Sequence, residues 1–117
     1  MMFAFVITAK KGKFMTDKEI FAPYHPGEML RETLEELGVS RYRFAKLTGI
    51  APSVLSGICN GKRGISVEVA IRIGRALGTG AQGWLNMQAL YDTQVAEDRN
   101  RDVFEKIQQL PQVAALA

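Results

Sequence analysis

Cysteine and histidine are the scarcest reactive residues of this chain, which has one of each among its 117 residues. A single cysteine excludes an internal disulfide, and one cysteine with one histidine is too few for a zinc site built from these ligands. A Cys–His catalytic pair would have to be Cys59 and His25, and no Ser/His/Asp, paired-carboxylate or metal-ligand set occurs at a usable spacing. We therefore expect a binding protein rather than an enzyme, with no metal site and no cofactor.

Long hydrophobic runs are also absent. The apolar stretch at residues 1–9 is shorter than the roughly 20 residues that a transmembrane helix needs. It differs from a signal peptide because lysines 10, 11 and 13 follow the apolar run instead of preceding it. Its alternating pattern fits an edge strand, while the Lys-Lys-Gly codons ahead of Met15 fit a ribosome-binding site inside a translated leader. We expect a cytoplasmic protein whose residues 1–24 are flexible or extended, and leave open whether residues 1–14 are leader.

The rest of the chain has the periodicity of a small helical domain. Hydrophobic residues make up 47% of the chain and charged residues 23%, which argues against disorder. Capping residues and glycine breaks separate helices between Pro26 and Gly38, Ser40 and Gly49, Pro52 and Asn60, Ser66 and Gly78, and about Ala81 and Asp98. The expected fold is all-α, with a domain over residues 25–98. A weaker helical extension is expected over residues 99–117, loose from residue 112 onward.

Two short helices between Ser40 and Gly61 meet at a turn that contains Gly49. Ala45 has to be small because the next helix packs over it, and Ile50, Leu55 and Ile58 point into the core. The same spacing assigns Leu37 and Leu47 to the inner faces of their helices. This layout is typical of a helix-turn-helix, which presents its second helix to the major groove of DNA. An ordinary helical hairpin is the alternative.

Positive charge is concentrated on this part of the chain. Residues 38–77 contain seven basic residues and one acidic residue, a net charge of +6. The rest contains eight basic and eleven acidic residues, a net charge of −3. Cations that contact DNA phosphates release counterions, so DNA binding requires such a patch. The asymmetry favours DNA as a partner over the alternative of a solvated basic face.

A series of motifs runs in one colinear order from His25 to Asp92. It consists of HPGE at 25–28, FAKLTGI at 44–50, LS at 55–56, NGKR at 60–63, IS at 65–66, WLNMQ at 84–88 and YD at 91–92. The series resembles the HigA family of antitoxins, a branch of the lambda-repressor-like helix-turn-helix proteins. The HPGE motif together with the final two motifs is the most specific part of the resemblance.

The resemblance implies a five-helix lambda-repressor-like fold, a homodimer, and binding to a palindromic operator in double-stranded DNA. It also implies a protein partner, a HigB-type toxin that cleaves mRNA, which the antitoxin neutralises while it represses its own operon. Two alternatives stay open: a solitary helix-turn-helix regulator without a toxin, and a protein-interaction module that has lost DNA binding.

Contacts to DNA are expected from the recognition helix, about Pro52 to Asn60, and from basic residues around it. Hydroxyl groups can bond to bases or phosphates, basic side chains position the protein on phosphates, and Asn60 either caps its helix or reaches the backbone. The expected DNA-contacting residues are Arg41, Arg43, Ala51, Pro52, Ser53, Ser56, Asn60, Lys62 and Arg63. Gly57 departs from the family, whose members often carry a long basic or polar residue there, and this predicts weaker operator specificity.

The fifth helix carries a stripe of large residues at helical spacing. Side chains that combine polarity with apolar bulk suit an interface rimmed by water, and the stripe continues into the extension. The expected dimer-interface residues are Trp84, Leu85, Gln88, Tyr91 and Phe104, with intramolecular core as the alternative for Trp84. His25 and Cys59 are expected to have structural roles only.

Overall fold

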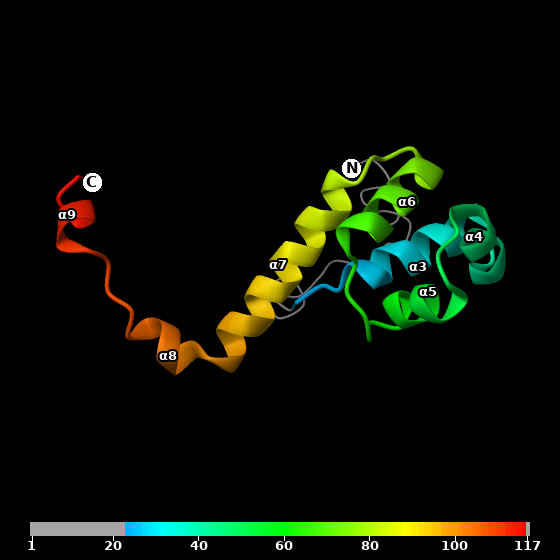
Figure 1. Cartoon of the computed structure of the whole chain (residues 1–117). Helices are drawn as coiled ribbons and strands as arrows, with labels where there is room; N and C mark the ends of the chain where they lie inside the picture. Colours follow the sequence, from blue (N-terminus) through cyan, green and yellow to red (C-terminus); the bar gives the residue numbers. More distant parts are fainter. Residues whose placement is uncertain (1–22, 117) are drawn as a thin grey trace.

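The computed structural model describes residues 23–116, which contain helices and no strands. The helices are α3 (Pro26–Leu37), α4 (Arg41–Thr48), α5 (Pro52–Cys59), α6 (Val67–Leu77), α7 (Gln82–Arg99), α8 (Arg101–Glu105) and α9 (Pro111–Ala114) (Figure 1). This confirms the prediction of an all-α fold with five principal helices. The strand or extended lead-in and the leader proposed for the N-terminal segment lie outside the described residues.

Three of the five principal helices, α3, α4 and α6, begin at side chains that accept hydrogen bonds from the first free backbone amides. His25, Ser40 and Ser66 accept from Gly27, Arg43 and Val69 respectively. Such caps satisfy donors that have no partner inside the helix. Because a cap acts over two or three residues, the sequence predicts these helix starts correctly.

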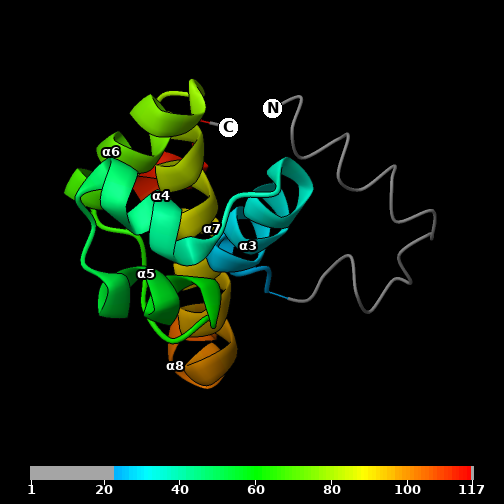
Figure 2. The same cartoon turned by 90° about the vertical axis from the view of Figure 1, so that its right-hand side faces the viewer.

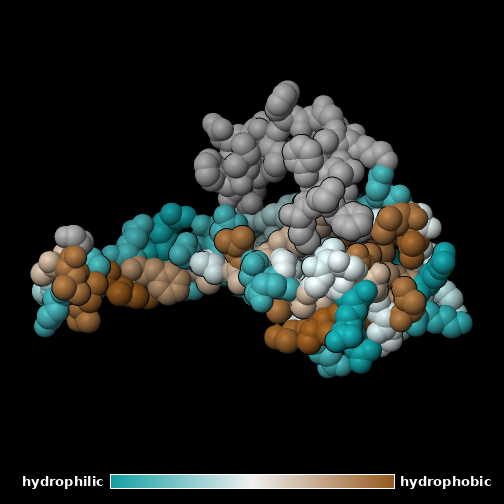
Figure 3. Space-filling model, turned by 90° about the horizontal axis from the view of Figure 1, so that it is seen from above, coloured by the Kyte–Doolittle hydropathy of each residue, from teal (hydrophilic) through white to brown (hydrophobic). Residues whose placement is uncertain are grey.

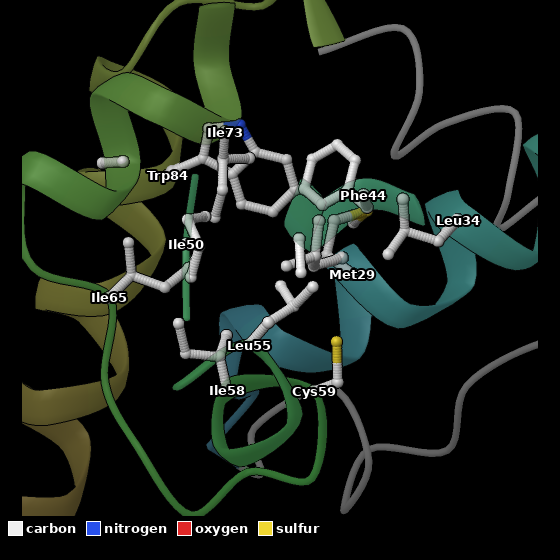
Figure 4. Close-up of a cluster of buried hydrophobic side chains, with 13 residues drawn as sticks. Met29, Leu34, Phe44, Ile50, Leu55, Ile58, Cys59, Ile65, Ile73 and Trp84 are labelled. Carbon is white, nitrogen blue, oxygen red and sulfur yellow. The ribbon is translucent and has the colours of Figure 1, made fainter. Parts of the chain in front are cut away.

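The core lies between α3, α4, α5, α6 and the first half of α7 (Figure 2). Helix α3 packs against α5 and α7, α4 packs against α5 and α6, and α6 packs against α7. Figure 4 shows the side chains from these helices meeting in one cluster, with Phe44 and Trp84 as its largest members. The predicted inward positions of Ala45, Ile50, Leu55 and Ile58 are confirmed, since all four are buried.

Helix α4 buries a different face from the one predicted. Leu47 is 71% exposed, whereas Thr48 is buried beside Phe44 and Ala45. The hydroxyl of Thr48 donates to the carbonyl of Phe44 at 2.8 Å, so a polar residue fits the core without an unpaired group. The prediction that Leu47 faces inward is therefore wrong, and so is the same prediction for Leu37, which is 48% exposed.

The chain after α7 forms a C-terminal arm, residues 100–116, that extends away from the α3–α6 bundle (Figure 1). The helix expected across residues 103–110 stops at Glu105, and Pro111 starts α9, so residues 112–114 are helical rather than loose. Figure 3 shows apolar surface along this arm, and its large hydrophobic residues are all exposed. No helix within residues 23–116 combines the length and apolar character needed to cross a membrane.

Candidate nucleic-acid interface

Helix α5 buries one side and leaves the other open. Leu55, Ile58 and Cys59 are buried, while Ala51, Pro52 and Ser53 are exposed at its N-terminal end. Within the described part of the chain, no side chain caps this end, in contrast to α3, α4 and α6. The exposed side of α5 can therefore approach a partner closely, with free backbone amides at its start.

Arg41 connects the start of α4 to the end of α5. Its Nη1 atom donates to Asn60 Oδ1 at 3.2 Å, and Asn60 Nδ2 donates to Ser56 Oγ at 3.4 Å. Three of the predicted DNA-contacting residues thus lie in one hydrogen-bonded group on α5 and its neighbour. Asn60 also stands at the C-cap position of α5, which is one of the two roles that the sequence predicts for it.

The loop after α5 folds back on the helix. The backbone amides of Lys62 and Arg63 both donate to the carbonyl of Gly57, at 2.8 and 3.1 Å. Both side chains are exposed, and none of the ion pairs found among residues 23–116 includes either of them. Two more of the predicted residues therefore join the group formed by Arg41, Ser56 and Asn60.

Arg43 is separated from this group. It follows Arg41 by two positions, which turns its side chain by about 200° around α4. Its backbone amide donates to Ser40 Oγ at 3.1 Å, and its side chain is exposed. Arg41 and Arg43 consequently point to nearly opposite sides of α4, although the sequence alone predicts the same role for both.

Sequence reasoning missed Tyr42, which lies between these two arginines. Its side chain is 70% exposed, and the Lys46 ammonium lies 5.7 Å from the centre of its ring. An exposed tyrosine offers a hydroxyl group to a phosphate at low cost in side-chain entropy. The Arg-Tyr-Arg sequence at the start of α4 was the available signal.

Arg72 of α6 holds the turn between α4 and α5. Its Nη1 atom donates to the carbonyl of Thr48 at 2.8 Å, and its Nε and Nη2 atoms donate to Glu68 at 3.3 and 3.1 Å. Gly49 adopts a left-handed conformation with φ 74°, and a Cβ atom there would lie 2.8 Å from Arg72 Nη1. Gly49 thus adopts the conformation that the turn requires and leaves room for the guanidinium group of Arg72. No local sequence signal indicates this role, because Thr48 is 24 residues away.

The HPGE motif positions α3 against α5. Gly27 approaches the carbonyl of Ile58 so closely that a Cβ atom at position 27 would overlap it. The Nδ1 atom of His25 accepts the Gly27 amide at 2.9 Å, and its ring meets the ring of Tyr91 edge to face, with centroids 4.8 Å apart. The motif therefore holds α3 close to the buried side of α5. His25 has the structural role that the sequence predicts.

Gln88 braces the loop that follows α5. Its Oε1 atom accepts the buried backbone amide of Ile65 at 2.7 Å, and its Nε2 atom donates to Asp92 Oδ1 at 2.9 Å. Loop residues 61–66 border an open hollow whose other walls include His25, Tyr91 and Asp92. Gln88 thus fixes the end of the segment that carries Lys62 and Arg63.

These contacts correct part of the predicted dimer interface. Trp84 is 1% exposed and its indole Nε1 donates to Thr79 Oγ1 at 2.9 Å, so it belongs to the core of the protomer. Gln88 is also buried inside the protomer. Leu85 and Tyr91 are half-buried and Phe104 is exposed, so these three retain surface that a partner could cover.

Neither Cys59 nor the acidic residues within residues 23–116 form a metal-binding site. Cys59 is buried, and burial raises the pKa of its thiol, an effect that the nearby charges of Arg41 and Arg31 partly oppose. Among residues 23–116, no three histidine, cysteine, aspartate or glutamate side chains are grouped so that they could hold a metal ion.

Comparisons with known proteins agree with this geometry. A family model described as helix-turn-helix matches residues 30–84. The chain is 41% identical to virulence-associated protein I of Dichelobacter nodosus over 80 residues, 68% of this chain and 74% of that protein. It is 35% identical to antitoxin HigA-1 of Vibrio cholerae, over 68% of this chain and 73% of that protein. The solved structure of Pseudomonas aeruginosa antitoxin HigA with the higBA promoter matches with a TM-score of 0.72 and 36% identity, covering 76% and 99% of the two chains.

Proposed function

Because this chain belongs to the HigA family of helix-turn-helix antitoxins, we propose that it binds an operator in double-stranded DNA and represses its own operon. Residues 25–98 form the DNA-binding domain in this proposal, and residues 99–117 form an extension to it. The protein acts in the cytoplasm, where the DNA is, and it is a binding protein rather than an enzyme.

One observation carries the proposal: three basic residues, Arg41, Lys62 and Arg63, lie around the exposed side of α5. Arg41 is bonded to Asn60, and Lys62 and Arg63 follow on a loop bonded to the α5 backbone. A helix placed in the major groove has phosphates on both flanks, so cations beside it can neutralise them while the helix faces the bases. Ser53 and Ser56 are then the α5 side chains that lie nearest to the base edges.

A salt series tests DNA binding directly. Fluorescence anisotropy with a labelled fragment from upstream of the protein's own gene should give an affinity that falls steeply with salt, with a logarithmic slope of about −0.9 for each phosphate contact. Lys62→Ala should weaken binding and reduce that slope by about 1. Arg75→Ala removes the same charge from an exposed position of α6 and serves as the matched control. The DNA-binding proposal fails if no affinity appears at low salt.

Arg41 and Arg43 provide a second comparison. Arg41 is bonded to α5, whereas Arg43 points away from Arg41 around α4. Arg41→Ala should therefore weaken binding to all DNA sequences more than Arg43→Ala does. Equal losses from the two substitutions would contradict the placement of Arg41 beside the bound backbone.

We propose a homodimer that uses the open side of α7 and the C-terminal arm. The large apolar residues that are exposed on these segments are Leu90, Val103, Phe104, Ile107, Leu110, Val113 and Leu116. Leu85 and Tyr91 add their remaining surface. Replacing Phe104 and Ile107 together by Asp should convert a dimer to a monomer in analytical ultracentrifugation. Leu47→Asp, at a position on α4 that is as exposed as Ile107, should not.

We also propose a HigB-type mRNA-cleaving toxin as the protein partner. This part rests on family membership, and the solitary regulator without a toxin is the alternative. Expression of the native operon with a tag on this chain tests it. Copurification of a small basic protein encoded next to this gene supports the antitoxin role, and its absence favours the solitary regulator.

A further inference from the structure

On the open side of α5, position 57 is occupied by glycine, so the helix backbone there is not covered by a side chain of its own. Gly57 lies one helical turn after Ser53, between Ser56 and the buried Ile58. Glycine inside a helix is unfavourable relative to alanine, so its presence here calls for a packing reason. The structure supplies one, because another side chain occupies this space.

Arg63 lies across α5 at Gly57. A Cβ atom at position 57 would come within 2.8 Å of Arg63 Cδ and 2.9 Å of its Cγ. The aliphatic part of Arg63 therefore runs over the bare helix backbone, and the guanidinium group continues beyond it. The Arg63 side chain is exposed, and the ion pairs found among the described residues leave its charge available.

The backbone that carries Arg63 is held from both sides. The Arg63 amide donates to Gly57 O, and Gln88 accepts the amide of Ile65 two residues later. The loop thus holds the Arg63 Cα in a fixed position relative to α5. A planar guanidinium delivered from a fixed backbone loses less freedom on binding than one on a mobile loop.

We propose that Arg63 is a specificity-determining residue that contacts a base edge from the open side of α5 at Gly57. The proposal rests on the DNA-binding function proposed above and adds to it. An arginine that reaches the major groove can donate two hydrogen bonds to the O6 and N7 atoms of guanine. A phosphate contact, the role that the sequence predicts for Arg63, would hold the protein on DNA without any contact to the bases.

Affinity for the upstream fragment and for an unrelated fragment of equal length separates the two roles. Arg63→Ala should lower the ratio of these affinities about 5- to 100-fold, the range that one bidentate base contact provides. Lys62→Ala is the matched control, and it should lower both affinities by the same factor. Arg63→Lys should restore the ratio only in part, because the ammonium group lacks the planar, pre-organised fork of the guanidinium, whereas it would largely restore a phosphate contact.

Gly57→Ala tests the path that Arg63 takes over the helix. Alanine favours the helix, and the arginine that it displaces is exposed, so the variant should keep its thermal midpoint. Its affinity ratio should nevertheless fall, and the double variant Gly57→Ala/Arg63→Ala should lose no more than Arg63→Ala alone. Additive losses would show that the two positions act separately and would overturn the proposal.

Modified DNA identifies the atom that is read. Replacing guanine by 7-deazaguanine throughout the upstream fragment removes the N7 acceptors. The wild-type protein should lose affinity for this fragment, and Arg63→Ala should lose a smaller factor. Equal losses for the two proteins, or a uniform effect of Arg63→Ala on both fragments, would overturn the base contact while leaving DNA binding intact. If the wild-type protein binds the two natural fragments with equal affinity, the result refutes the operator proposal itself and not only the role of Arg63.

Discussion

Replacing Gln88 by Leu is the most informative test of the contacts that hold the loop after α5 against α7. Gln88 makes two hydrogen bonds that differ in burial: its Oε1 atom accepts the amide of the buried Ile65, and its Nε2 atom donates to the exposed Asp92. Leucine has a similar volume and keeps the apolar contacts, so the substitution removes mainly the polar interactions. The effect can then be assigned to one backbone amide.

The loss should come from the Ile65 amide rather than from Asp92. A buried donor left without an acceptor costs about 1–3 kcal/mol, whereas Asp92 can bond to water instead. We expect Gln88→Leu to lower the free energy of unfolding by about 2 kcal/mol, a large fraction of the roughly 5–15 kcal/mol typical of a domain. DNA affinity should also fall, because the loop carrying Lys62 and Arg63 loses its anchor.

Urea denaturation followed by tryptophan fluorescence measures the stability. Trp84 is the sole tryptophan of the chain and is 1% exposed, so its emission reports the core directly. Asp92→Ala is the control, and it should cost less than about 0.5 kcal/mol, as exposed substitutions usually do. Equal stabilities for the two variants would refute the argument that Gln88 braces the loop through a buried amide.

Three further predictions concern the packing around α5. Gly27→Ala should destabilise the fold by about 3 kcal/mol or more in urea, because the new Cβ overlaps the Ile58 carbonyl. Gly38→Ala, where φ is 68° and the space is open, should cost only about 1–2 kcal/mol; the reverse order would contradict this packing. Arg72→Ala should lower DNA affinity, measured by anisotropy, more than Arg75→Ala, which removes the same charge from the same helix. Equal losses of affinity would show that Arg72 does not act through the turn. Cys59 should react with a disulfide reagent only on unfolding. Since burial raises the pKa of its thiol, the contribution of Cys59 to the free energy of unfolding should be complete below pH 9.0 and should decline above it. Cys59→Ala should abolish this part of the pH dependence.

The sequence predicted the helices well because their boundaries depend on local chemistry. Ser40 and Ser66 accept amides within three residues, and Gly49 ends α4 in the left-handed conformation that glycine favours. The exception inside this region is α4 itself. In an eight-residue helix, periodicity cannot separate Leu47 from Thr48, and the choice depends on a hydroxyl bonded to its own helix.

The site was predicted less well because its key contacts join distant parts of the chain. Gln88 and Ile65 are 23 residues apart, and Arg72 and Thr48 are 24 residues apart. A stripe of large residues on a helix looks the same whether it faces a second protomer or the loop of its own protomer. For this reason the sequence predicts Gln88 at the dimer interface, whereas in the structure it bonds to the loop of its own protomer.

The contact between Gly57 and Arg63 likewise joins parts of the chain that the sequence alone does not connect. Along the chain, a glycine in the recognition helix removes a side chain and predicts weak specificity. In three dimensions, the space above it holds the stem of Arg63, whose backbone is bonded to Gly57 itself. The surface offered to DNA is therefore built jointly by α5 and the braced loop after it. Its specificity depends on how firmly α7 holds that loop as well as on the residues of α5.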